Sequence, residues 1–321
     1  MRSLSLKVKL FLILTISLMA FLLNFTFIIH STYKEYKTAK IEQEYTIMAK
    51  SLIELIHEIA KERGLSTVYV ASRRDFFKNK MLIERNILDG KLVKFEDSLK
   101  KSNLTIAKKI TEILQKEKEK LYKIRNKTVI DAERTNYVEV FNFYSGLIES
   151  LYTFFKNSKI LSGNFEHEIY PLDRLKNIEG KLRAFIAVGL ATKIDNLIIQ
   201  KINEYCNEKK LIFTSHITED LNKILQRRVY KTPIGIKIHQ IITKLKNGEK
   251  VNITPEEWWK IKTRQIDELY KIELNIIDHT LKTISTKQEI LRKRLIGEFF
   301  FLFYISCIID NSGCSNFKRC I

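Results

Sequence analysis

The stretch from Ile56 to Ser72, IHEIAKERGLSTVYVAS, constrains the fold more than any other part of the chain. Apolar residues lead into it at the three- and four-residue spacing of a single helix face: Leu52, Leu55, Ile56 and Ile59. The next position on that face is Arg63, and its neighbours Lys61 and Glu62 point to other faces. A guanidinium is costly to bury unless an anion or a carboxylate lies beside it. Either the chain supplies a carboxylate here, or a small anion binds.

A second arginine stands in a similar setting. When KERGL at 61–65 is aligned with KLRAF at 181–185, the lysine and the arginine match, and Arg183 faces Arg63. Two helical units related by an ancient duplication would explain this weak repeat. An alternative remains open for Arg183, because Glu179 lies four residues earlier and could pair with it on a solvated face.

The scarcity of helix breakers sets the fold class. Only 10 Gly and 3 Pro occur in 321 residues, which favours long helices over many short strands. The first helix is predicted to continue from the membrane through Arg63 to about Ser72. Apolar periodicity predicts further helices at about 81–100, 104–125, 130–157, 175–203, 211–228, 237–246 and 255–288. The last of these starts at a capping box, Thr254-Pro255-Glu256-Glu257. We predict an all-α fold of two tandem antiparallel four-helix bundles, about 31–160 and 165–292, flanked by transmembrane helices.

The N-terminal region predicts a membrane anchor. Leu10 to Ile29 contains no charged residue and is long enough to cross a bilayer as a helix. Lys7 and Lys9 precede it, so the positive-inside rule puts the N-terminus in the cytoplasm. A cleaved signal peptide is the rival interpretation, but no small-residue cleavage pattern follows the run. We therefore predict a cytoplasmic tip and transmembrane helix at 1–30 and an extracytoplasmic sensor domain at 31–292.

The C-terminal region contains a second candidate for a transmembrane helix. Leu295 to Ile309 is a second apolar run, short for a span and interrupted by Glu298. Because a long helix leads directly into it, we predict a second, short transmembrane helix at 293–310; the alternative is a terminal apolar tail. Residues 311–321 are interpreted as the tail of a truncated reading frame without an output domain.

Composition argues against two other functional classes. The formal net charge is +19, but the lysines are spread over nearly every segment and no nucleic-acid-binding motif accompanies them. The four cysteines lack zinc spacing, and no phosphate loop, nucleophile elbow or acid pair appears. We expect no nucleic-acid partner, no metal or cofactor, and no enzymatic activity.

Four segments, in this order, resemble the nitrate- and nitrite-sensing (NIT) domain of bacterial methyl-accepting chemotaxis receptors. KERGLSTVYVAS at 61–72 is similar to the opening motif of that domain. ERNILD at 84–89, FYSGLIESL at 143–151 and ITPEEWWKIKTRQIDEL at 253–269 resemble later elements, and the first and last segments are the more specific ones. The likeness extends from about Glu44 to Asp278.

The resemblance implies two four-helix bundles and an arginine-lined pocket for a small oxyanion. Guanidinium offers flat, forked donors that suit planar nitrate or nitrite. Arg63 matches the family motif directly. Arg183 follows from its place in the second half, although Leu182 stands where the family has an acidic residue. The further candidate ligand residues are Ser66 and Thr67, one turn after Arg63, and Arg264, which could instead lie on a solvated face.

The resemblance also implies a cellular role. Such a chain would be a homodimer in the bacterial inner membrane, with its sensor domain in the periplasm. It would bind nitrate or nitrite and pass a helix shift to a chemotaxis-type output. Two alternatives remain: the sensor portion of a histidine kinase, and a ligand-indifferent bundle that binds a partner protein, with Arg63 satisfied by an internal carboxylate.

Overall fold

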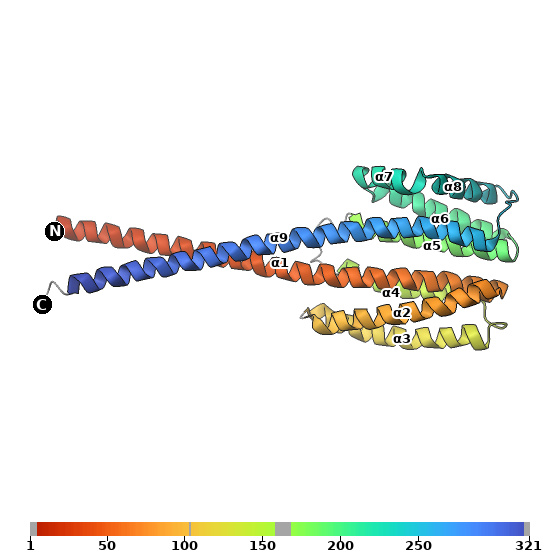
Figure 1. The fold of residues 1–321 in the computed structure, drawn as a ribbon, viewed down its shortest axis with the longest axis horizontal. Coiled ribbons are helices and arrows are strands. Elements are labelled where there is room, and N and C mark those ends of the chain that lie inside the picture. The colour runs from red at the N-terminus through yellow and green to blue at the C-terminus, as the bar shows by residue number, and fades with distance from the viewer. Residues whose placement is uncertain (1–4, 103, 158–167, 318–321) are drawn as a thin grey trace. The chain divides into compact units, whose positions relative to one another are not determined.

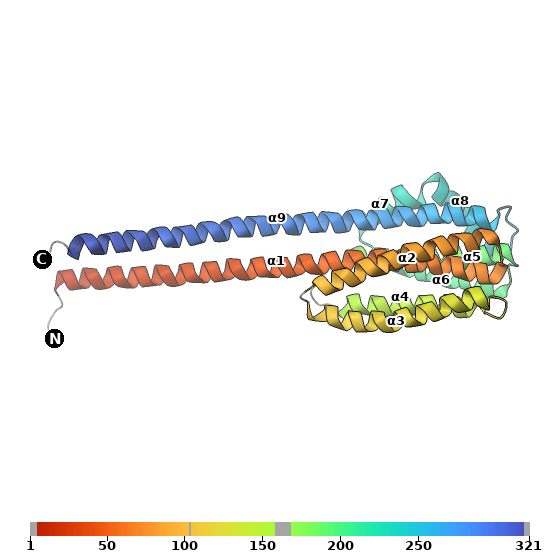
Figure 2. The same ribbon diagram turned by 60° about the horizontal axis from the view of Figure 1, so that its bottom comes forward.

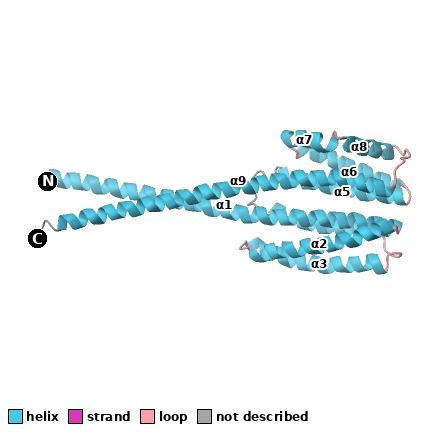
Figure 3. Cartoon of the chain, in the orientation of Figure 1, coloured by secondary structure: helices cyan, strands magenta, loops and turns pink. Residues whose placement is uncertain are grey.

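The structure is a computed structural model that describes residues 5–102, 104–157 and 168–317. Within these ranges every regular element is helical, as Figure 3 shows, which confirms the all-α prediction. The elements shown in Figure 1 are α1 (Leu6–Ser72), α2 (Asp75–Lys101), α3 (Thr105–Ile130), α4 (Tyr137–Asn157), α5 (Tyr170–Ala191), α6 (Asn196–Ser215), α7 (Glu219–Leu225), η2 (Gln226–Tyr230), α8 (Pro233–Lys246) and α9 (Pro255–Phe317).

The chain divides into two compact units. The first contains residues up to Gln43 and residues from Leu281 onward, and the second contains Glu44–Thr280. The boundary predicted between two bundles, at 160–165, and the end of the predicted tail, 318–321, lie outside the described residues.

In the first unit, the beginning of α1 lies antiparallel to the end of α9 (Figure 2). The Thr32 hydroxyl donates to Glu298 Oε1 at 3.2 Å, and the side chain of Gln288 donates to the Ala39 carbonyl at 2.9 Å. Among the described helices, only α1 is long and apolar enough to cross a membrane, and its apolar segment is not buried by other parts of the protein. The end of α9 is not apolar enough over a sufficient length to meet the same criterion, so the second transmembrane helix stays a prediction.

In the second unit, two buried glutamates each join four segments. Glu62 of α1 accepts hydrogen bonds from side chains of α2, α3 and α4. Glu179 of α5 contacts side chains of α6, η2 and α9. The contacts within Glu44–Thr280 nevertheless make a single compact unit, so the division into two tandem four-helix bundles also stays a prediction.

Two of the predicted helices are in fact interrupted. The helix expected at 175–203 ends at Ala191, and α6 begins after Asp195, whose carboxylate accepts from the Ile198 amide at 2.9 Å. The helix expected at 211–228 is divided in the same way, because Thr218 caps a new helix, α7. In both places a polar side chain satisfies free amides at a helix start, which the apolar periodicity alone does not reveal.

Candidate functional site

Arg63 lies in the core of the second unit, completely buried on α1. Its Nη1 donates to the Ser145 hydroxyl of α4 at 3.3 Å, and its Nη2 donates to the Asn177 carbonyl of α5 at 3.3 Å. Its Cζ lies over the ring of Phe141, 5.1 Å from the centroid. The Nε group is buried and has no partner among the described residues. Arg63 therefore retains an unused donor inside the protein.

Arg183 on α5 is buried to the same degree, with 1% of its surface exposed. Its Nη1 donates to the Thr263 hydroxyl of α9 at 2.9 Å, and its Cζ lies over the ring of Trp259, 4.1 Å from the centroid. Its main-chain carbonyl accepts from the indole of Trp258 at 3.1 Å. Its Nε, like that of Arg63, is buried and finds no partner in the described structure.

The two arginines receive the same kind of support. Each contacts an aromatic ring and, four residues later on the same helix, a hydroxyl: Phe141 and Ser145 on α4, Trp259 and Thr263 on α9. Residues four apart lie on one face of a helix, so each pair presents its ring and its hydroxyl together. The weak sequence repeat around the two arginines thus corresponds to a repeat of their contacts.

Each guanidinium also reaches the helix that carries the other arginine. A Cβ added at Gly180 of α5 would lie 3.3 Å from Nη2 of Arg63, and one added at Gly64 of α1 would lie 3.7 Å from Nη2 of Arg183. The Gly64 position is the tighter one, because the same Cβ would lie 2.7 Å from the ring of Trp259. Glycine at these two places allows α1, α5 and α9 to approach closely around the arginines.

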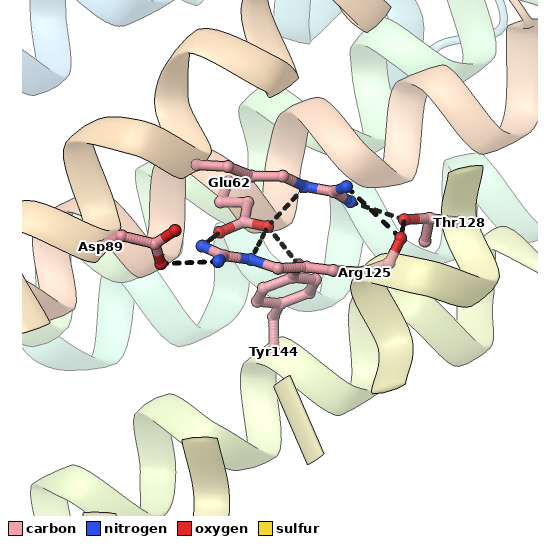
Figure 4. A network of polar contacts seen from close by, with 6 residues as sticks. Glu62, Asp89, Arg125, Thr128 and Tyr144 are labelled. Carbon is pink, nitrogen blue, oxygen red and sulfur yellow. Dashed lines mark hydrogen bonds and ion pairs between the residues drawn. The ribbon is translucent and has the colours of Figure 1, made fainter. Parts of the chain in front are cut away.

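The Glu62 carboxylate, next to Arg63 in sequence, forms its hydrogen bonds with residues other than Arg63. Glu62 accepts from Arg85 at 3.0 Å, from Arg125 at 2.6 and 2.8 Å, and from the Tyr144 hydroxyl at 2.7 Å (Figure 4). Figure 4 also shows Asp89 beside Arg125, which donates to it at 2.6 Å. This network lies among α1, α2, α3 and α4, and it leaves Arg63 without a counter-charge.

The carboxylate near Arg183 is committed as well, so the solvated Glu179–Arg183 pair considered from the sequence does not form. Glu179 is fully buried, is bonded to Lys262, and contacts Lys209 at 2.6 Å. Burial alone would raise the pKa of Glu179, but the two lysines outweigh it and hold that pKa at about 2. Glu179 is therefore ionised and already neutralised by groups other than Arg183.

The result is a pair of buried, unneutralised cations. Neither Arg63 nor Arg183 forms an ion pair with a carboxylate of the described residues. Burial lowers the pKa of Arg63 to about 10. Burial also lowers the pKa of Arg183 to about 10; the Asp267 carboxylate opposes this shift in part, and the charge of Arg63 adds to it. Both remain cationic at neutral pH, and a buried charge without a partner is strongly destabilising.

The remaining predicted ligand residues differ in position. Ser66 is buried one turn after Arg63, and its hydroxyl has no partner among the described residues. Thr67 is buried too, but its hydroxyl donates to the Arg63 carbonyl at 2.6 Å. Arg264 is exposed on α9 beside an open groove and is not brought to the two arginines. One residue along a helix turns the side chain by about 100°, so Arg264 points away although its neighbour Thr263 points inward.

Comparison with known proteins identifies the family. A model of the family described as nitrate and nitrite sensing (NIT) matches residues 54–281, which is more than half of the chain. The chain belongs to the NIT family. Both arginines lie inside the match, whereas the apolar ends of α1 and α9 lie outside it.

The solved structure of the NasR transcription antiterminator is similar in fold to this NIT protein. The TM-score is 0.65 at 14% sequence identity, over 84% of this chain and 80% of that chain. At this level of identity the likeness concerns the fold alone. A search of curated proteins gave no match.

Sequence reasoning missed several residues of this NIT site. Phe141 and Trp259 fitted apolar stripes, and nothing local distinguished them from ordinary core residues. A signal that could have found them is the aromatic-x-x-x-hydroxyl spacing, which Phe141 and Ser145 share with Trp259 and Thr263. The residues contributed to the arginines by other helices are Phe141, Ser145, Asn177, Trp259 and Thr263.

Proposed function

We propose that this protein is a membrane-anchored receptor that binds nitrate or nitrite between Arg63 and Arg183. The observation that carries the proposal is the pair of buried guanidiniums, each with an unpartnered Nε and neither with a carboxylate. Membership of the NIT family supports nitrate or nitrite as the anion. A trigonal oxyanion accepts in-plane hydrogen bonds from guanidinium and neutralises part of its charge. Ser66, with its free hydroxyl, is the neutral donor placed nearest to Arg63 along α1.

The signal is a shift of helices. A bound anion attracts Arg63 of α1 and Arg183 of α5 toward the same point, whereas the two cations repel each other without it. Packed helices respond to such changes by small sliding steps of about 1–2 Å between discrete arrangements. α1 is one continuous helix from its apolar beginning to Arg63. A displacement of α1 at Arg63 would therefore also displace its proposed membrane-spanning segment.

The cellular setting belongs to the same proposal. The unburied apolar part of α1, with Lys7 and Lys9 before it, supports an inner-membrane anchor and a periplasmic sensor domain. The end of α9 would provide the second crossing, and a homodimer would pass the shift to a chemotaxis-type or histidine-kinase output.

The test is calorimetric titration of the full chain in detergent with nitrate, nitrite and chloride. We expect saturable binding of nitrate or nitrite, and its loss in Arg63→Met and in Arg183→Met. Methionine is chosen because replacing a buried charge by an apolar side chain of similar length is often neutral or stabilising, so the variants should fold. The matched control is Arg134→Met, an exposed arginine, which should bind as the wild type does.

The contrary results are also defined. If a folded wild-type sample gives no heat with nitrate or nitrite, the proposed ligand is wrong. If it binds and both methionine variants bind equally well, the site is wrong. A thermal scan adds a second readout, because ligand at 100 times its Kd stabilises the folded state by about 2.7 kcal/mol.

A further inference from the structure

We propose that Trp259, assisted by Phe141, restricts the arginine site to flat anions, and that Trp259 is the main determinant of anion selectivity. The inference rests on the proposed function, since it concerns the same two arginines. It adds two residues that contact the guanidiniums by their ring faces.

The contact between Trp259 and Arg183 is close. The Arg183 Cζ lies over the indole at 4.1 Å from the ring centroid, so the ring fills the space on that side of the guanidinium. Trp259 is itself held in place, because it packs edge-to-face on Phe77 of α2, with centroids 5.6 Å apart, and its far edge rests against Gly64 of α1. The ring cannot turn aside without moving one of these neighbours.

Arg63 is enclosed in a comparable way. Phe141 lies 5.1 Å from its Cζ, and Phe141 packs edge-to-face on Phe185 of α5 at 4.6 Å. Near Nη2 of Arg63, Gly180 leaves room for the guanidinium, yet a Cβ there would lie only 3.3 Å from it. The space around each guanidinium is thus limited by a ring and by the backbone of a neighbouring helix.

These contacts decide how an anion can approach. The N–H groups of guanidinium radiate in its own plane, and a covered face excludes approach from above. The unpartnered Nε–H groups therefore donate best to an anion that lies in the guanidinium plane. A trigonal anion places two oxygens in that plane and has no atoms above or below it. A tetrahedral anion carries oxygens out of the plane, toward the ring, and chloride has no pair of acceptor atoms to match the fork.

The experiment compares anions of one charge and different shape: nitrate, perchlorate and chloride. Dissociation constants are measured calorimetrically on the full chain in detergent, and selectivity is the ratio of the perchlorate Kd to the nitrate Kd. The variants are Trp259→Leu, which removes the ring, and Trp259→Phe, which keeps an aromatic face. Phe95→Leu is the matched control, because it removes a fully buried ring of α2 that makes no ring or cation–π contact among the described residues.

We expect the wild type to prefer nitrate over perchlorate and Trp259→Leu to narrow that ratio by about tenfold or more, the size of a desolvated cation–π contact. Trp259→Phe should keep most of the preference for nitrate, and Phe95→Leu should keep it while lowering the melting temperature. Circular dichroism establishes that each variant is folded.

Three results would overturn the inference while leaving the proposed function standing: a wild type that binds nitrate and perchlorate equally, an unchanged ratio in Trp259→Leu, or an equal loss of selectivity in Phe95→Leu. A wild type that binds none of the three anions removes the proposed function, and the selectivity inference with it.

Discussion

At the scale of single residues, the adjacent pair Glu62 and Arg63 shows how one position along a helix separates two roles. The Glu62 carboxylate is fully buried and neutralised by Arg85 and Arg125, whereas Arg63 has no carboxylate partner. Consecutive residues point about 100° apart, so the two side chains enter different parts of the core. Glu62 stabilises the helices that surround it, and Arg63 is the residue that we propose binds the anion.

The importance of Glu62 is testable with Glu62→Gln. The amide has nearly the same shape but no charge, so the buried Arg85 and Arg125 lose their shared carboxylate. Breaking a buried ion pair in this way costs about 3–5 kcal/mol, which corresponds to a fall in melting temperature of about 10 °C or more. Thermal unfolding followed by circular dichroism measures it.

The matched control is Glu139→Gln. Glu139 pairs with Lys127 at 2.7 Å, and both side chains are largely exposed. An exposed pair contributes at most about 1 kcal/mol, so this variant should lose no more than about 3 °C. Similar losses in the two variants would mean that the Glu62 network does not hold the helices together.

The sequence predicts one arginine of the site better than the other, for a physical reason. Arg63 continues an apolar stripe, so its burial follows from helical periodicity. Arg183 has Glu179 one turn before it, which satisfies the local pairing rule. The true partners of Glu179 are Lys209 and Lys262, which come from other helices. Ion pairs between distant segments depend on how the helices pack, and the spacing of residues along one helix does not predict them.

At the scale of elements, two glycines in different helices allow a matched comparison. Gly64 of α1 faces Trp259, whereas Gly90 of α2 is exposed with nothing within 4 Å of an added Cβ. Alanine in a helix is favoured over glycine by about 0.5–1 kcal/mol. Gly90→Ala should gain that amount. Gly64→Ala should lose stability overall, because overpacking a core costs about 1–3 kcal/mol.

Melting temperatures of the two alanine variants measure this difference, and nitrate titration of Gly64→Ala shows whether displacing Trp259 also weakens binding. A Gly64→Ala protein as stable as Gly90→Ala would mean that α1 and α9 are not held at the distance seen here.

Helix ends were the least predictable elements. The start of α9 at Pro255 agrees with its capping box, in which the Thr254 hydroxyl accepts from the Glu257 amide at 3.1 Å and the Glu257 carboxylate accepts from the Thr254 amide at 3.0 Å. Asp195 and Thr218 act in the same way at the starts of α6 and α7, but they stand inside stretches whose periodicity continues across them. A single capping residue outweighs a continuing apolar pattern when the amides it satisfies would otherwise remain free.

At the scale of the whole molecule, the proposed membrane anchor is open to a direct test. Leu14 and Leu18 are exposed on one face of α1. Lysine near the centre of a bilayer costs about 2.5–3.5 kcal/mol in insertion, so the double variant Leu14→Lys/Leu18→Lys should leave the membrane pellet after alkaline carbonate extraction. The wild type should remain there.

The control for this prediction places lysines at two exposed apolar positions of the second unit, Ile130→Lys and Leu211→Lys. That variant should stay in the pellet with the wild type. Release of the wild type itself would contradict the anchor.

If the proposed function holds, the two buried arginines also affect how long the protein survives in a cell. A protein with two buried, unpaired cations is less stable empty than loaded, and proteases act on the small fraction that is open or unfolded. At an anion concentration 100 times the Kd, that fraction would fall about a hundredfold. We therefore expect turnover to slow when the anion is plentiful, so that ligand supply sets the number of receptors as well as their activity.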